Sequence, residues 1–262
     1  MNILHAALLG ALQGLTEFLP VSSSGHLVIA EALLDPGKAG AWRGGGITFE
    51  VAVHVGTLVA VVFYFRRRLL DMVLAVFDSS RKAERRMIWY LIVGTAPAVV
   101  VGLFLSSIID EAFHSPREAA VELMISGAIL LALKWAPERL RPLSAMRALI
   151  IGIAQAVAIL PGISRSGSTI AAGLYLGVSR AEVAEYSFLL SVPAIMGAAI
   201  LEIPNLSQID TTLAQASIVG ACVAGIVGFL TIGWLMRLIR QGQLLWFGVY
   251  CFVAGAAFLL FL

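Results

Sequence analysis

Long apolar runs dominate this sequence, and they restrict the possible folds more than any other feature. Six of them approach the roughly 20 apolar residues that a helix needs to cross a membrane. These runs cover residues 47–65, 87–109, 118–135, 184–203, 215–236 and 244–262. Charged residues make up only 13% of the 262-residue chain, whereas soluble domains carry about 25%. The runs therefore predict an all-α polytopic membrane protein with six transmembrane helices.

Two further pairs of apolar segments are too short or too interrupted to cross. The first pair comprises residues 3–19 and 27–34, and the second comprises residues 146–160 and 168–178. A turn rich in serine and glycine separates the members of each pair. Irregular backbone survives at membrane depth only where protein or a cavity surrounds it. We therefore expect two re-entrant helix–loop–helix hairpins.

The basic residues indicate how such a chain would be oriented. They gather in residues 66–86, in residues 134–147, and at Arg237 and Arg240 after the fifth run. With six crossings all three groups fall on one side, which the positive-inside rule makes cytoplasmic. Both termini are then expected outside the cytoplasm. The formal net charge of +2 is too small to suggest a nucleic-acid partner.

An internal repeat divides the single membrane domain, residues 1–262, into copies covering about 1–136 and 142–262. At an offset of 142 positions, identical residues pair as Ala6/Ala148, Gly10/Gly152, Gln13/Gln155, Ser22/Ser164, Ser24/Ser166, Gly25/Gly167 and Ala30/Ala172. Three predicted crossings separate the copies, so the second copy would be inverted. Inverted repeats with broken helices place their sites near the midplane, where the copies meet. The two polar turns should therefore approach each other from opposite faces.

The second turn, Pro161–Thr169, places one arginine among hydroxyl groups. Arg165 cannot lose its charge by deprotonation, so at membrane depth it needs an anionic partner. Phosphate suits it, because arginine binds phosphate with two parallel hydrogen bonds and the following helix would add N–H donors. The other candidates for substrate binding in this turn are Ser164, Ser166, Gly167, Ser168 and Thr169. The alternative is that Arg165 pairs with Glu17 across the repeat interface.

The first turn, Gln13–His26, carries the acidic and titratable groups. Gln13 and Glu17 are four residues apart and share a helical face. Glu17 is a candidate ligand for a divalent cation, with Gln13 as a neutral oxygen ligand, because hard cations prefer oxygen. Alternatively, Glu17 orients or deprotonates His26, which is suited to acid–base chemistry near neutral pH.

Three serines in the same turn are candidate nucleophiles. Ser22, Ser23 or Ser24 could attack phosphorus if His26 removes the hydroxyl proton. The alternative is that these serines cap the open backbone of the turn. His54 lies inside the first crossing, and we interpret it as a helix-packing hydrogen-bonding residue, with a supporting role beside the site as the alternative.

Gln13–His26 and Pro161–Thr169 resemble the two motifs of the bacterial undecaprenyl-diphosphate phosphatases, also called bacitracin-resistance proteins. The resemblance extends over essentially the whole chain. It implies six crossings, two re-entrant hairpins, an inverted-topology repeat and a site open to the extracytoplasmic side of the bacterial cytoplasmic (inner) membrane. Gln13 stands where the family has either Glu or Gln, which leaves Glu17 as the only acidic metal ligand in the motif. Ser24 stands where the family often has threonine.

The implied reaction is hydrolysis of a C55 polyprenyl diphosphate to the monophosphate and inorganic phosphate. This recycles the carrier lipid for cell-wall synthesis and gives bacitracin resistance. The expected catalytic residues are Glu17, Ser23, His26 and Arg165, with Mg²⁺ or Ca²⁺ as the expected cation at Glu17. Ser23 is the expected nucleophile with His26 as its base, and direct attack by the histidine is the competing mechanism. The expected substrate-binding residues are Gln13, Ser22, Ser24, Gly25, Ser164, Ser166, Gly167, Ser168 and Thr169.

The expected partners are the polyprenyl diphosphate and the surrounding membrane lipids, with a homodimer kept as an alternative assembly. A different function remains open at this point. Inverted repeats with broken helices also mark secondary transporters. A polyprenyl-phosphate flippase or transporter would use the same midplane site without catalysis.

Overall fold

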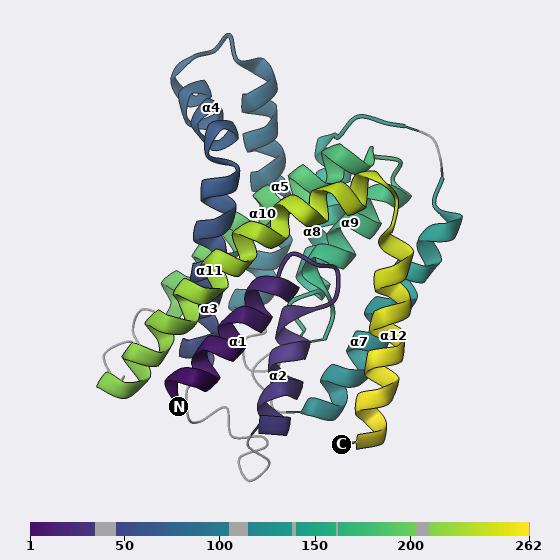
Figure 1. The fold of residues 1–262 in the computed structure, drawn as a ribbon. Coiled ribbons are helices and arrows are strands. Elements are labelled where there is room, and N and C mark those ends of the chain that lie inside the picture. The colour runs from purple at the N-terminus through teal and green to yellow at the C-terminus, as the bar shows by residue number, and fades with distance from the viewer. Residues whose placement is uncertain (35–45, 105–114, 138–139, 161, 203–209, 262) are drawn as a thin grey trace.

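The structure is a computed structural model that describes residues 1–34, 46–104, 115–137, 140–160, 162–202 and 210–261. Regular secondary structure in these residues is helical, with no strand among them (Figure 1). The helices are α1 Ile3–Thr16, α2 Ser23–Leu34, α3 Gly46–Tyr64, α4 Arg66–Phe77, α5 Lys82–Phe104, α7 Pro116–Leu131, η3 Ala132–Trp135, α8 Ala145–Val157, α9 Arg165–Tyr175, α10 Arg180–Glu202, α11 Thr211–Arg240 and α12 Leu244–Phe261. The predicted all-helical class is confirmed.

Long apolar helices give the chain the character of a multi-pass membrane protein. Among the described residues, α5, α10, α11 and α12 are long and apolar enough to cross a membrane. A fifth span is formed if α3 and α4 are one crossing, although they are bent by 77° at their junction. α7 has 16 residues and continues into a 3₁₀ turn, so it is shorter than the predicted run at 118–135.

The first basic connection is more ordered than the sequence suggested. Residues 66–77 form α4, which packs on α5, and α5 already begins at Lys82. Arg68 donates a hydrogen bond of 2.9 Å to Glu185 on α10 and lies 3.3 Å from Glu84 on α5. These ion pairs tie the bent end of α3 and α4 to the rest of the bundle.

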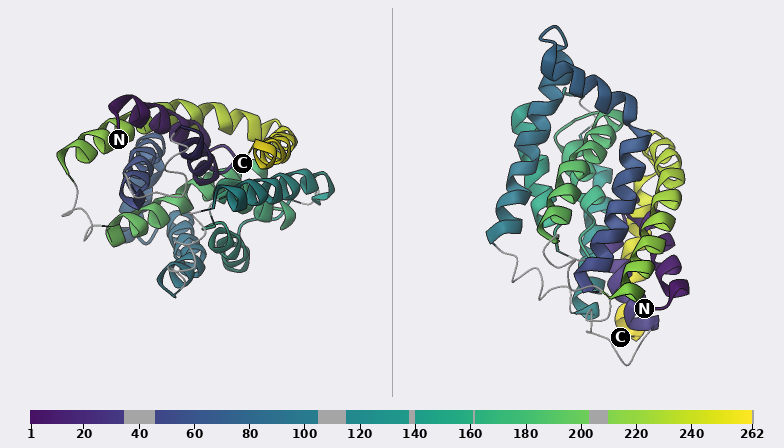
Figure 2. Two further views of the ribbon diagram at one scale, coloured as in Figure 1. Left: turned by 90° about the horizontal axis from the view of Figure 1, so that it is seen from below. Right: turned by 90° about the vertical axis from the view of Figure 1, so that its left-hand side faces the viewer.

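Both broken pairs are helical hairpins that run into the molecule from opposite ends. α1 and α2 rise from the end that carries the two termini, whereas α8 and α9 descend from the opposite end (Figure 1). The α3–α4–α5 and α11–α12 connections also lie at that opposite end (Figure 1). The two views in Figure 2 show α1 along α11 and α12 along α7, in agreement with the helix contacts.

Each hairpin packs closely on one long helix through a pair of glycines. A Cβ atom on Gly10 of α1 would lie 2.4 Å from the carbonyl oxygen of Gly220 on α11. A Cβ atom on Gly152 of α8 would lie 2.2 Å from the carbonyl oxygen of Gly94 on α5. Small residues let helix backbones approach in this way in membranes. Phe18 also packs edge-on against Phe188 of α10, with ring centroids 5.8 Å apart, which ties the first turn to α10.

Candidate active site

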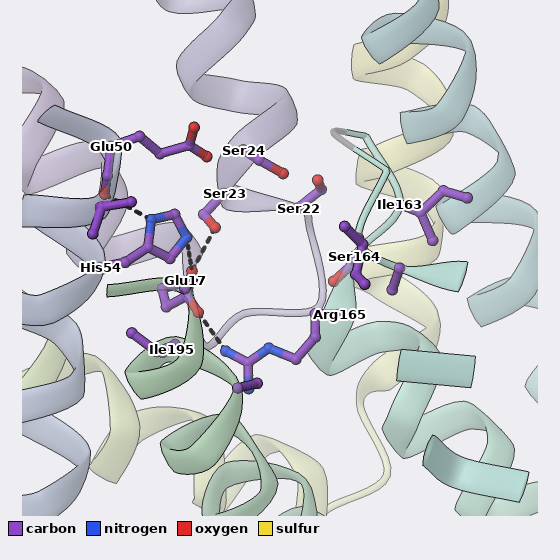
Figure 3. Close-up of a pocket in the computed structure, with 15 residues that line it drawn as sticks. Glu17, Ser22, Ser23, Ser24, Glu50, His54, Ile163, Ser164, Arg165 and Ile195 are labelled. Atoms are coloured by element: carbon purple, nitrogen blue, oxygen red, sulfur yellow. Dashed lines mark hydrogen bonds and ion pairs between the residues drawn. The ribbon is translucent and has the colours of Figure 1, made fainter. Parts of the chain in front are cut away.

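Glu17 lies at the centre of the cluster formed where the two hairpin turns meet (Figure 3). One carboxylate oxygen is paired with the Arg165 guanidinium from the second hairpin. The other oxygen accepts hydrogen bonds from Gln13 Nε2 at 2.9 Å and Ser23 Oγ at 2.6 Å. His54 Nε2 lies 3.3 Å from that same oxygen. The ion pair across the repeat interface, the alternative considered for Arg165, is therefore present in the structure.

The first turn reaches this geometry through an unusual backbone conformation. Ser22 has φ of +63°, and it is the only non-glycine residue in the described part of the chain with a positive φ. Such a conformation is strained for a residue with a side chain, and strain of this kind clusters at functional sites. The Ser22 hydroxyl accepts the Gly25 N–H at 3.3 Å, so it caps the start of α2. Ser23 is thereby turned back toward Glu17.

The second turn is held by a network of serine hydroxyls. Ser164 caps α9 by accepting the Gly167 N–H at 3.0 Å. Ser126 of α7 supports the turn from outside, because its hydroxyl accepts the Ser164 N–H at 2.8 Å and donates to the Gly162 carbonyl at 3.0 Å. Arg165 is the first residue of α9, so its side chain leaves the helix at the N-terminal end, where N–H groups gather.

The two turns also contact each other directly. The Ser166 hydroxyl donates to the Leu19 carbonyl at 3.0 Å. A Cβ atom on Gly167 would lie 3.4 Å from Cβ of Pro20, which is an ordinary van der Waals contact between the two turns. The predicted approach of the two polar turns is therefore present in the structure.

A cavity of about 310 Å³ opens beside the Glu17–Arg165 pair. Its polar lining consists of Glu17, Ser22, Ser23, Ser24, Glu50, His54, Ser164 and Arg165. Its apolar lining comes mainly from the second turn and from α10. Nη1 of Arg165 is buried and has no hydrogen-bond partner among the described residues, so this nitrogen retains a donor for an anionic ligand.

His26 does not contact Ser23, the serine for which it was the predicted base. Its Nδ1 lies 2.7 Å from the Ser22 carbonyl and its Nε2 lies 2.8 Å from the Tyr250 hydroxyl of α12. The two rings are stacked, with centroids 5.7 Å apart. The Ser23 hydroxyl instead donates to Glu17. In this arrangement Glu17, rather than His26, is the group placed to accept the Ser23 proton.

The remaining predicted residues support the turns rather than line the cavity. The Thr169 hydroxyl lies 2.6 Å from the Ser187 hydroxyl of α10 and donates to the Arg165 carbonyl. Ser168 is buried on α9. Gln13 holds Glu17 from within α1. All the predicted site residues therefore lie in the two turn segments. Of these, Glu17, Ser22, Ser23, Ser24, Ser164 and Arg165 line the cavity.

His54 and Glu50 are cavity residues that the sequence interpretation did not assign to the site. His54 contacts Glu17. His54 and Glu50 both line the cavity from α3. They are four residues apart and therefore share one face of that helix. Ionisable residues at this spacing in an apolar crossing are costly unless they serve a site. That spacing was the signal available in the sequence.

The carboxylates also allow a test of whether the lining fits a divalent cation. Within the described ranges, no group of three His, Cys, Asp or Glu side chains could hold a metal ion. Glu17 already has four donors around its two oxygens, which matches the roughly four acceptor sites of a carboxylate. Glu50 is buried on α3 and lines the same cavity. A hard cation commonly binds one or two carboxylates together with substrate phosphates. The lining fits a cation shared with a phosphate ligand, not one caged by protein alone.

Fold and site together define a class: a multi-pass helical membrane protein whose paired hairpins present arginine, serine and carboxylate groups to one buried cavity. Residues 6–257 match the family model described as bacitracin resistance protein BacA, and the chain belongs to this family. Three relatives are each named undecaprenyl-diphosphatase. The protein from Korarchaeum cryptofilum is 41% identical over 99% of both chains. That from Geobacter metallireducens is 39% identical over 100% of this chain and 99% of its own. That from Methanosphaera stadtmanae is 37% identical over 97% of this chain and 96% of its own.

Proposed function

We propose that this protein hydrolyses undecaprenyl diphosphate to undecaprenyl phosphate and inorganic phosphate. This activity recycles the carrier lipid for cell-wall synthesis and gives bacitracin resistance. The name shared by full-length relatives supports the substrate. The single observation that supports the chemistry is the cavity in which Arg165, Ser23 and Glu17 meet.

Arg165 is assigned to the transferring phosphate. Its Nη1 has no protein partner among the described residues, and the guanidinium can bind two phosphate oxygens at once. Ser22, Ser24 and Ser164 add hydroxyls on the cavity wall. Phosphoryl transfer depends mainly on positioning and on neutralising charge, and this set of donors can do both.

Ser23 is assigned as the nucleophile. Its oxygen bonds to the terminal phosphorus while the bond from that phosphorus to the bridging oxygen breaks, and undecaprenyl phosphate leaves. The Ser23 proton passes to Glu17, which already accepts its hydrogen bond. Water then cleaves the phosphoserine, which releases inorganic phosphate and restores the hydroxyl. His26 is retained as a second proton acceptor that must first rotate away from Tyr250.

A divalent cation, Mg²⁺ or Ca²⁺, belongs to the same proposal. Glu17 and Glu50 would hold it together with the diphosphate, because both carboxylates line the cavity and Glu17 gains an open oxygen site when Arg165 turns to the phosphate. When bound, the cation would neutralise part of the phosphate charge. Gln13 also has a buried amide oxygen without a partner among the described residues, which could orient Glu17 or a ligating water.

The finer topology is also proposed. Six crossings, with α7 as the short one, and two re-entrant hairpins place the basic connections in the cytoplasm and both termini outside the bacterial inner membrane. The position of the α3–α4–α5 and α11–α12 connections opposite the termini supports this orientation (Figure 1). The Gly10–Gly220 and Gly152–Gly94 contacts support an inverted repeat, because the two hairpin glycines occupy matching repeat positions.

The experiment that tests the function is phosphate release from undecaprenyl diphosphate by the purified protein. We expect one phosphate per lipid, with a loss of about tenfold or more when a chelator is added and recovery on adding Mg²⁺ or Ca²⁺. Release no faster than that of a Glu17→Ala/Arg165→Ala double variant would refute hydrolysis. Lipid movement across vesicles without phosphate release would favour the flippase instead.

A further inference from the structure

His54 faces an oxygen acceptor from each of its two ring nitrogens. Nδ1 lies 2.8 Å from the backbone carbonyl of Glu50, and Nε2 lies 3.3 Å from a Glu17 carboxylate oxygen. His54 therefore reaches Glu17 from α3 on the carboxylate oxygen that Arg165 does not contact.

Helix packing does not explain this side chain. α3 packs against α11 through a different face, where Phe49 and Val53 lie close to Gly220 and where a Cβ atom on Gly56 would be 2.1 Å from the Ala221 carbonyl oxygen. His54 projects into the cavity (Figure 3). The face of α3 that packs on α11 is therefore not the face that carries His54.

The proposed reaction gives His54 a specific task. Arg165 is paired with Glu17, but its guanidinium is also the group assigned to the phosphate. When Arg165 turns toward phosphate, the buried Glu17 loses its charged partner and depends on its remaining contacts with Gln13, Ser23 and His54 to stay in place. His54 approaches the other carboxylate oxygen, the one that accepts the Ser23 hydrogen bond, so it can stay when Arg165 moves.

We propose that His54 is a positioning residue of the phosphatase reaction. It holds the Glu17 carboxylate in the orientation that accepts the Ser23 proton while Arg165 is occupied by phosphate. This inference rests on the proposed function, because it concerns the same nucleophile and the same transferring group. His54 acts through Glu17 and need not touch the substrate.

The test compares His54→Ala and His54→Gln with the parent protein in the phosphate-release assay. His54→Ala should lower kcat by about 100-fold, since a misplaced group costs about that much, while KM stays within about threefold. His54→Gln keeps one N–H donor and should recover kcat to within about tenfold of the parent. Thr231→Val is the matched control, because it removes a buried hydroxyl that donates to the Val227 carbonyl within α11, away from the cavity lining, and it should leave kcat unchanged.

A double-mutant cycle with Glu17→Gln separates positioning from a general structural role. If His54 acts through Glu17, adding His54→Gln to Glu17→Gln should lower kcat by less than about twofold further. Effects that multiply in the double variant would overturn the proposal, as would a His54→Ala kcat within twofold of the parent. If His54→Ala fails to fold, His54→Gln and the cycle still decide. Absence of phosphate release by the parent itself would instead count against the proposed function.

Discussion

The two hairpin turns share one capping arrangement although they lie far apart in the chain and enter the molecule from opposite ends (Figure 1). In the first, Ser22 accepts the Gly25 N–H at 3.3 Å, and in the second, Ser164 accepts the Gly167 N–H at 3.0 Å. Both pairs occupy matching positions of the sequence repeat. The shared residues therefore build the turns, since each serine satisfies an N–H that the start of a helix leaves open.

The turns differ in the charge that they present. The first residue of α2 is Ser23, whereas the matching first residue of α9 is Arg165. Glu17 has the apolar Ile159 as its counterpart. One turn thus carries the carboxylate and the hydroxyl, and the other carries the cation. The repeated residues thus cap the turns, and the differing residues are the ones to which the proposed mechanism assigns the chemistry.

Removing the cation from the second turn should have the largest effect. Arg165→Ala leaves the buried Glu17 short of a partner and deprives the phosphate of its bidentate donor, so we expect kcat/KM to fall at least about 10³-fold. Arg165→Lys keeps the charge but loses the planar fork, and we expect it to recover only part of the loss. Phosphate release measures both. If Arg165→Ala retains kcat/KM within tenfold of the parent, the second turn does not supply the cation that the phosphate needs.

Ser23, the counterpart of Arg165, should be nearly as sensitive. Ser23→Ala removes the proposed attacking oxygen and should lower kcat by about 10³-fold. Ser22→Ala and Ser164→Ala remove the two equivalent caps instead, and each should cost about 1 kcal/mol of stability with less than a tenfold change in kcat. Equal kcat losses for Ser23→Ala and Ser22→Ala would break the distinction between frame and chemistry.

A smaller effect is expected at the His26–Tyr250 contact, which has no equivalent ring pair in the second turn, where Ser168 matches His26. His26→Ala should lower kcat by about 100-fold if the ring serves as a second proton acceptor. Tyr250→Phe removes the 2.8 Å contact and should change kcat by less than about threefold. A near-normal His26→Ala enzyme would leave Glu17 as the sole proton acceptor for Ser23.

The sequence contained enough to predict the meeting of the turns, because the repeat, the broken apolar segments and the Arg165–Glu17 complementarity are local or periodic features. The orientation of His26 was not accessible in the same way. Tyr250 lies 224 residues further along the chain, and only tertiary packing brings its hydroxyl to the imidazole.

Helix faces and lengths account for the other differences. The sequence predicts His54 to be a packing residue, because its four-residue spacing from Glu50 indicates a shared helix face but not whether that face meets a cavity or a neighbouring helix. The sequence predicts residues 66–77 to be part of a basic connection because they begin with three arginines. In the structure these residues form the amphipathic helix α4 directly after α3. The fold class was therefore predictable, whereas the supporting side chains around Glu17 were only partly so.

The smallest effects on activity should come from the glycines that seat the two hairpins, and these test whether the two frames are equivalent. Gly10→Ala would place a Cβ atom 2.4 Å from the Gly220 carbonyl oxygen, and Gly152→Ala would place one 2.2 Å from the Gly94 carbonyl oxygen. Overpacking of this kind costs about 1–3 kcal/mol, so both variants should unfold at lower temperature in detergent while kcat changes by less than about tenfold. Gly102→Ala and Gly197→Ala are matched controls, because a Cβ atom there meets no heavy atom of the described residues within 4 Å. Destabilisation at one hairpin glycine without the other would show that the two halves are not packed alike, whatever their sequence repeat.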